Sequence, residues 1–454
     1  MRTLLRLVIL SGLVLVLTAG AVTTASAATG APSHVEGTLP SGATFVMDVP
    51  ARWNRTVLLY SHGYVVQGSP NPAQNGPSPA TRDALLAEGY ALIGSSYATT
   101  GWAVEEALAD QLATLDEFGR RFGRARQTFA WGTSMGGMIT TALAEREGHR
   151  FDGALAMCGL QQGAVANFNN TLDPVFAIRT LLAPDADVPL VRIPDQASAF
   201  GALGVLSVAM NAAQQTPLGR ARIALAAALH NIPAWTDPGQ PEPAPDDYDT
   251  AQLNQFRTLG LTLYVGLSWR QEAEVRAGGN MSWNIGVDYA SLLARSPLRA
   301  EVEALYERAG GSLHADLASL AAAPRIGPDL GAVGYMLRYV TFTGRLRTPL
   351  LTIHTTGDPL VPVQVQDAYA DTAEDAGRGP LLRQAFVHRA GHCTFTAGEM
   401  LAALRTVMRR AATGQWRGTD PAALNALAAS LDPAVPAYQA YDPAPYPRPF
   451  DLAL

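Results

Sequence analysis

The chain has 454 residues, of which 48% are hydrophobic and 16% are charged, and its formal net charge is -6. This composition indicates a globular protein with a sizeable core, and the mild acidity argues against a nucleic-acid-binding protein, which would usually carry a basic face. The sequence contains no lysine. That absence excludes a P-loop, a Schiff-base lysine and a Ser-Lys dyad, and we expect no cofactor.

The N-terminus has the pattern of an export signal. Arg2 and Arg6 precede an apolar run over residues 7–17, and residues 25–27 form the small-residue cleavage pattern Ala-Ser-Ala. The apolar run is shorter than the ~20 residues that span a bilayer. We therefore predict that residues 1–27 are a signal peptide, that no stable membrane span remains after its removal, and that the mature protein is secreted from a bacterium.

Strand and helix patterns alternate over the first third of the mature chain. The predicted strands are an edge hairpin over 36–50 and runs over 55–63, 90–97, 127–132 and 151–159. The predicted helices cover 80–90, 102–123 and 135–147. This alternation predicts the α/β class, with a mostly parallel sheet and helices on both of its faces.

The alternation stops at residue 161 and resumes near residue 346. The intervening residues are rich in alanine and leucine and largely helical in pattern. Strands are then predicted over 347–359 and 381–388, and helices over 363–376 and 397–413. We predict one α/β domain built from 28–160 and 346–431, a helical insertion over 161–345, and a proline-rich tail over 432–454.

The stretch Gly132-Thr133-Ser134-Met135-Gly136 lies between a predicted strand and a predicted helix. It fits the nucleophile elbow G-x-S-x-G, in which a sharp turn exposes a serine hydroxyl and the small neighbours avoid a collision. The helix N-terminus behind the serine favours negative charge on a reacting oxygen. Ser134 is therefore the predicted nucleophile, and a structural glycine-rich bend is the alternative.

A nucleophilic serine needs a base and an acid that orients the base. Asp358 follows one downstream strand and His392 follows the next, and parallel-sheet enzymes place catalytic groups at these strand ends. His388 is the alternative base, and His354 fits better as a buried structural histidine. The run "HRAGH" lacks the helical Glu-containing spacing of a zinc motif, so no metal site is expected.

With these three residues in this order, the sequence resembles the alpha/beta-hydrolase superfamily over 35–159 and 347–413. Within it, secreted serine esterases, lipases and prolyl-oligopeptidase-like hydrolases with a large helical lid are the nearest types. The resemblance implies an oxyanion hole formed by the backbone N–H groups of Met135 and Tyr64, with His62 structural. The hydroxyl of Tyr64 is a second option for that residue. The insertion would be a lid over the site.

The two cysteines, Cys158 and Cys393, would lie in an oxidising compartment after export, which favours one disulfide over two separate thiols. The bridge would attach the loop of His392 to the root of the insertion. Secreted feruloyl esterases and tannases resemble this arrangement, but there the partner cysteine is beside the serine, where this chain has Thr133.

The expected function is hydrolysis of carboxylic esters with apolar or aromatic groups, because apolar and aromatic runs fill the insertion. The substrate would be a small-molecule or polymeric ester. The alternative is a secreted aminopeptidase, in which Glu105 or Glu106 would bind the substrate amine; as first-turn residues they would otherwise complement the helix dipole. A non-catalytic binding protein is the third possibility, and the oligomeric state is open.

Overall fold

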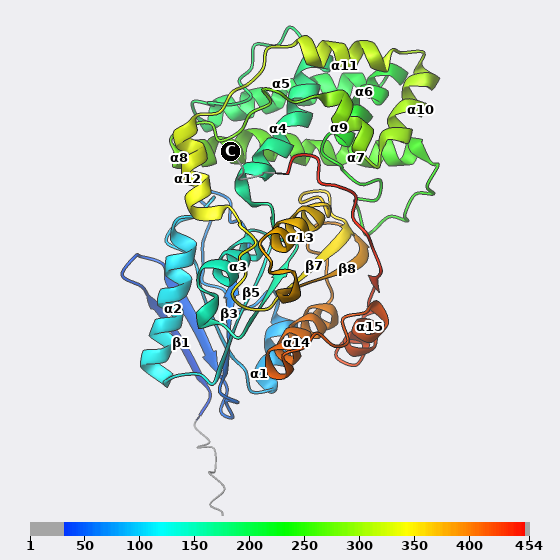
Figure 1. Ribbon diagram of the computed structural model, residues 1–454. Helices are drawn as coiled ribbons and strands as arrows, with labels where there is room; N and C mark the ends of the chain where they lie inside the picture. The colour runs from blue at the N-terminus through cyan, green and yellow to red at the C-terminus, as the bar shows by residue number, and fades with distance from the viewer. Residues whose placement is uncertain (1–30, 450–454) are drawn as a thin grey trace, which may run out of the picture.

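The computed structural model describes residues 31–449, and the predicted signal peptide lies outside these residues. The molecule has two layers (Figure 1): a twisted sheet with helices on both faces, and above it a region made almost entirely of helices. Because the second layer follows β6 and precedes β7, it corresponds to the stretch in which the sequence loses its alternation.

One sheet of nine strands crosses the lower layer in the order β1-β2-β4-β3-β5-β6-β7-β8-β9. The strands are β1 Ser33–Thr38, β2 Thr44–Val49, β3 Thr56–Ser61, β4 Ala91–Ser95, β5 Gln127–Thr133, β6 Gly153–Met157, β7 Leu350–Gly357, β8 Leu382–Ala390 and β9 Tyr438–Gln439. All pairs from β4 to β8 are parallel, whereas β1, β2 and β9 pair antiparallel. The central strands are buried on both faces, which explains their continuous apolar runs.

Helices cover both faces of this sheet, so the predicted α/β class is confirmed. One face is covered by α2 Glu106–Phe122, α3 Met135–Arg146 and α13 Val365–Asp375, and the other by α1 Pro79–Ala87, α14 Ala397–Thr413 and α15 Pro421–Ala429. The α14 helix matches its predicted range, and its start carries a capping box between Thr396 and Glu399. The short turns η1 Gly148–Arg150 and η3 Gly379–Leu381 lead into β6 and β8.

The helical region consists of the elements from α4 to α12. Its elements are α4 Gly163–Leu182, α5 Gln196–Ala213, α6 Pro217–Ala228, α7 Tyr248–Tyr264, the π-helix η2 Val265–Trp269, α8 Arg270–Ala277, α9 Tyr289–Arg295, α10 Arg299–Ala309, α11 Leu313–Ala322 and α12 Leu330–Val340. It has a hydrophobic core of its own, centred on α4 and α6. Its expected role as a lid stays a prediction.

The C-terminal tail joins the two layers. It rises from α15 past the sheet to the helical region (Figure 1), and on the way β9 pairs with β8 as an additional edge strand. At its end Tyr446 is buried and Arg448 forms a bidentate ion pair with the buried Asp173 of α4, at 3.0 and 2.8 Å. The tail therefore holds the helical region against the sheet.

Among the described residues, α5 is the one helix that is long and apolar enough to cross a membrane, and 22% of it is buried. Its outer face exposes Phe200, Val205 and Val208. One such helix is weak evidence for a membrane span, because core helices of globular proteins meet the same criteria.

Candidate active site

Ser134 occupies a sharp turn between β5 and α3. Its φ of 57° and ψ of -124° are strained for a residue with a side chain, and its N–H donates to the carbonyl of Met157 at 2.9 Å. A Cβ at Gly136 would overlap the carbonyl oxygen of Ser61, and one at Gly132 would overlap the backbone of Gly136. Glycine is therefore needed at both positions, by the turn itself at Gly132 and by the end of strand β3 at Gly136.

Ser134, His392 and Asp358 form one hydrogen-bonded chain. Nε2 of His392 lies 2.8 Å from Oγ of Ser134, and Nδ1 lies 2.7 Å from Oδ2 of Asp358. The three residues follow β5, β8 and β7, whose carboxyl ends meet at one edge of the sheet. In this geometry the imidazole can accept the serine proton while the carboxylate orients the ring.

The carboxylate of Asp358 is fully buried and fully hydrogen-bonded. Oδ1 accepts the backbone N–H groups of Leu360 and Val361, both at 2.9 Å. Burial alone would raise the pKa of Asp358, but the charge of His392 and the hydrogen bonds from His354 and His392 outweigh it and hold the pKa well below its usual range. Asp358 is therefore ionised at neutral pH and can stabilise a positive imidazole.

His354 lies behind this carboxylate, at 3.3 Å from its Oδ2. Gln366 donates from Nε2 to Nδ1 of His354 at 2.9 Å, which leaves the proton on Nε2, where it reaches the carbonyl of Val361 at 2.9 Å. The expectation of a buried, satisfied histidine is confirmed. Its contact with Asp358 was missed, because it depends on the turn that the chain makes after the end of β7 at Gly357.

The two backbone N–H groups expected to form the oxyanion hole belong to the residues that follow Ser134 and Gly63. Met135 begins α3 directly after Ser134, and a Cβ at Gly63 would lie 3.3 Å from that of Ser134, so Tyr64 follows a residue in direct contact with the serine. Within residues 31–449, the N–H groups of Met135 and Tyr64 have no protein acceptor. The two ring nitrogens of His62 lie 2.7 and 3.0 Å from the carbonyl oxygens of Gly63 and Ser96, and because burial lowers the pKa of His62, the neutral ring donates to one of them.

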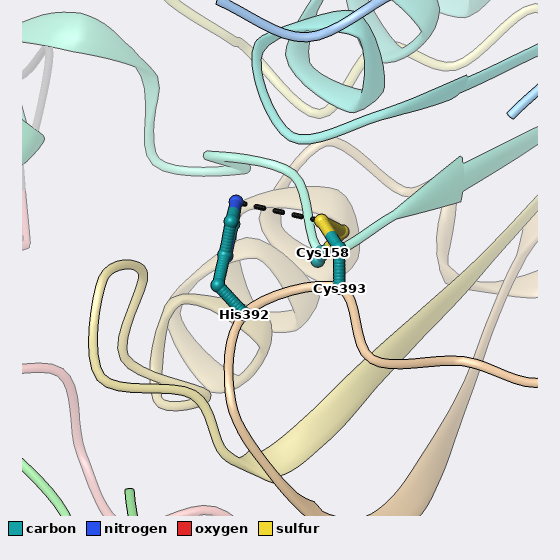
Figure 2. Close-up of side chains that lie close together, drawn as sticks. All are labelled: Cys158, His392 and Cys393. Atoms are coloured by element: carbon teal, nitrogen blue, oxygen red, sulfur yellow. Dashed lines mark hydrogen bonds between the residues drawn. A yellow bond between two sulfur atoms is a disulfide. The ribbon is translucent and has the colours of Figure 1, made fainter. Parts of the chain in front are cut away.

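The predicted disulfide between Cys158 and Cys393 is confirmed, with the two Cα atoms 5.4 Å apart. Figure 2 shows it directly beside the imidazole of His392, whose Nε2 is 3.4 Å from the sulfur of Cys393. The two sulfurs are bonded to each other, so these three residues are not a set of free thiolate and imidazole metal ligands. The bridge ties the His392 loop to the end of β6.

The alternative base His388 lies away from this chain of residues. Its Nε2 pairs with Glu242 at 3.0 Å and its Nδ1 is 3.2 Å from the side chain of Gln439 on β9. Side chains alternate along β8, and His392 follows the strand in the turn. The structure therefore brings His392, and not His388, to Ser134.

Glu105 and Glu106 contact the helical region. Glu106 forms a bidentate ion pair with Arg276 of α8 at 2.8 and 2.9 Å, and Glu105 accepts hydrogen bonds from Tyr335 and Tyr339 of α12, at 3.1 and 3.0 Å. Both carboxylates already have protein partners. The geometry gives no support to their expected contact with a substrate amine, which stays a prediction.

Aromatic side chains gather on the Tyr64 side of the serine. The ring of Tyr64 stacks on Trp269 with centroids 4.0 Å apart, and it lies 5.6 Å from Trp102, which contacts Phe168 at 5.1 Å. Tyr64 and Trp102 belong to the sheet layer, whereas Trp269 and Phe168 belong to the helical region. The two layers therefore meet through aromatic rings close to the nucleophile.

The chain is a hydrolase of the α/β-hydrolase fold. This follows from the strand order of the sheet, the sharp turn at Ser134, and the positions of Ser134, Asp358 and His392 after the ends of parallel strands. The chain is 30% identical over 418 residues to the o-phthalyl amidase of Xanthobacter agilis, across 86% of this chain and 90% of that enzyme. The chain belongs to the family of this amidase.

No family model matches the chain. Among solved structures, it is similar to an acylaminoacyl peptidase from Pyrococcus horikoshii (12% identity, 84% of this chain and 40% of that one, TM-score 0.37). It is also similar to Est1E from Butyrivibrio proteoclasticus (11% identity, 84% of this chain and 99% of that one, TM-score 0.36). The chain thus spans about two fifths of the length of that peptidase.

Proposed function

We propose that this protein is a serine hydrolase that cleaves amides and esters of aromatic carboxylic acids. The observation that carries the proposal is the continuous hydrogen-bonded chain from Ser134 through His392 to Asp358, in a chain whose family includes an o-phthalyl amidase. The amidase relative extends the expected ester substrates to amides.

In the proposed reaction, Oγ of Ser134 attacks the substrate carbonyl while Nε2 of His392 takes the hydroxyl proton. The N–H groups of Met135 and Tyr64 stabilise the oxyanion of the tetrahedral intermediate. His392 then returns the proton to the departing amine or alcohol, and the acyl group remains on Ser134. Water, activated by His392, attacks the acyl-enzyme and releases the acid.

Amide cleavage depends on that returned proton, because without it the nitrogen would have to leave as an amide anion, a far poorer leaving group than an alkoxide. The low pKa of Asp358 keeps a negative charge on the far side of the imidazole while it carries the proton. The partly buried ring of Tyr64, whose neighbour Gly63 contacts Ser134, supports an aromatic acyl group. Export is part of the proposal, supported by the signal pattern of residues 1–27 and by the disulfide.

The test uses purified wild-type protein and Ser134→Ala at pH 8. The substrates are phthalyl p-nitroanilide, benzoyl p-nitroanilide, p-nitrophenyl benzoate and alanyl p-nitroanilide. Enzyme-free blanks correct for attack of the phthalyl carboxylate on its own amide. We expect wild type to cleave aromatic acyl substrates and Ser134→Ala to lose at least ~10³-fold in kcat.

Two outcomes would contradict the proposal. Cleavage of alanyl p-nitroanilide alone would favour the aminopeptidase. Full activity of Ser134→Ala would exclude the serine as nucleophile.

A further inference from the structure

The loop that carries Tyr64 is held from outside the sheet layer. Val65 forms an isolated antiparallel bridge with Gly101, whose N–H donates to the carbonyl of Val65 at 2.8 Å. Residues 64–65 and 101–102 are therefore two short segments that support each other beside Ser134. Neither belongs to a regular strand or helix, so their position depends on what packs against them.

Glu272 of α8 binds the second of these segments. Its Oε2 accepts the backbone N–H of Trp102 at 2.9 Å, and only 4% of the residue is exposed. Gly101 has a φ of 76°, and a Cβ there would overlap the carboxylate of Glu272. The glycine thus allows a carboxylate from the helical region to approach the backbone directly.

Trp269 binds the first segment. It ends the π-helix η2, three residues before Glu272 of α8, so the two side chains lie on the same face of this continuous helical segment. Its ring stacks on Tyr64 at 4.0 Å with an interplanar angle of 25°. Local π-helices are frequent at functional sites, and this one ends at the indole that stacks on Tyr64.

Arg276 holds the same contact from one turn further along α8. It lies 3.2 Å from Glu272 through Nε, pairs with Glu106 through Nη1, and donates from Nη2 to Thr99 at 3.0 Å. Burial raises the pKa of Glu272, and Arg276 counteracts this. Glu272 thus contacts Arg276 and the backbone N–H of Trp102 at the same time.

We propose that Trp269 and Glu272 are positioning residues through which the helical region aims the Tyr64 N–H at the developing oxyanion. The inference rests on the proposed function, because it assumes that Tyr64 is an oxyanion donor. Removing one such donor typically costs ~10²–10³ in kcat. A donor that is present but poorly aimed should cost less, on the order of 10 to 100-fold, while substrate binding changes little.

The test compares Glu272→Ala and Trp269→Ala with the conservative variants Glu272→Gln and Trp269→Phe. Glutamine keeps an oxygen for the N–H of Trp102, and phenylalanine keeps a ring against Tyr64. Arg146→Ala is the matched control: Arg146 donates to the carbonyls of Arg338 and Thr341, so this variant loses a contact between the layers that does not touch the Tyr64 loop.

The readouts are kcat and KM on p-nitrophenyl benzoate and the affinity for an aryl trifluoromethyl ketone, whose adduct with the serine carries an oxyanion. We expect kcat and the affinity for the ketone to fall ~10 to 100-fold in both alanine variants. KM for p-nitrophenyl benzoate should stay within about threefold of the wild-type value. The conservative variants should stay within about threefold of wild type. A rise in KM with kcat unchanged would overturn the proposal. An equal loss of kcat and ketone affinity in Arg146→Ala would overturn it as well.

Two further measurements keep the result interpretable. If an alanine variant does not fold, Trp269→Leu, which fills the space without an aromatic face for Tyr64, must still weaken ketone binding more than Arg146→Ala does. The second measurement is the rate at which a fluorophosphonate phosphonylates Ser134. This rate can be measured without knowing which substrates the enzyme cleaves. If wild type cleaves no aromatic amide or ester, the proposed function is wrong. If the alanine variants are phosphonylated at the wild-type rate, the positioning role is wrong, whatever the substrate.

Discussion

His354 and His392 both contact Oδ2 of Asp358, with Nε2 of His354 at 3.3 Å and Nδ1 of His392 at 2.7 Å. His354 is itself fixed by Gln366, which also donates to Gln161 at 3.0 Å and accepts from Thr352. A buried polar network therefore extends from the acid into the sheet. Because all of its members are buried, the loss of one member leaves unpaired polar groups.

We predict that His354→Phe lowers kcat by up to about tenfold, because Asp358 loses one hydrogen bond that holds it in place. His354→Gln should retain more activity, since its amide can still donate. Steady-state kinetics of both variants, with circular dichroism to check folding, test this. Equal activity of His354→Phe and wild type would show that the backbone N–H groups of Leu360 and Val361 suffice.

We predict that opening the disulfide lowers both activity and stability. Cys158 and Cys393 are 235 residues apart, so the bridge is worth about 5 kcal/mol in the chain-entropy model. The double variant Cys158→Ser/Cys393→Ser should unfold at a lower temperature and lose kcat, because Cys393 is next to His392. Thiol titration of the denatured wild-type protein should find no free thiol. Two titratable thiols in protein purified without reductant would contradict the bridge.

We predict that Gly136→Ala yields inactive or insoluble protein. Its Cβ would overlap the carbonyl oxygen of Ser61 at the end of β3, and backbone cannot move aside as a flexible side chain can. Gly119→Ala on α2 is the matched control, because nothing lies within 4 Å of a Cβ there, and it should stabilise the protein by about 0.5–1 kcal/mol. Thermal melts and activity of the two variants separate a local collision from a general effect of alanine.

We predict that the free energy of unfolding falls as the pH rises from about 5 to about 7. Glu301 on α10 is 4% exposed, its Oε1 has no partner in the described chain, and burial raises its pKa to about 7. The folded state therefore holds a proton that the unfolded state has released. The bound proton stabilises the folded state by up to about 3 kcal/mol. This stabilisation is complete below the pKa of Glu301 in the unfolded chain and is lost as the pH rises through its pKa in the folded protein.

Urea unfolding of wild type and Glu301→Gln at several pH values checks this prediction. Glutamine cannot ionise, so the variant should lose less stability over the same pH interval. If the free energy of unfolding falls equally with pH in both proteins, Glu301 is not the group responsible.

Much of the sheet layer could be predicted because its signals are local. Alternating apolar runs and turn residues predicted the strands and the helices around them, and the 397–413 helix appears with those bounds. The G-x-S-x-G elbow could be recognised because its motif is local, although the collisions that its glycines avoid include one with Ser61 on the adjacent strand β3. The positions of Asp358 and His392 after strands followed from the order of the elements.

Other features depend on segments that are far apart in the chain. Sequence alone left His388 and His392 as alternatives, and only the strand register and the turn after β8 placed His392 beside Ser134. Glu106 could serve a substrate or a helix dipole until Arg276, 170 residues away, supplied its partner. The sequence by itself determined the nucleophile turn and the α/β order, because these follow from local sterics and periodicity. The tertiary structure decided which polar groups meet, because that depends on the packing of the helical region onto the sheet.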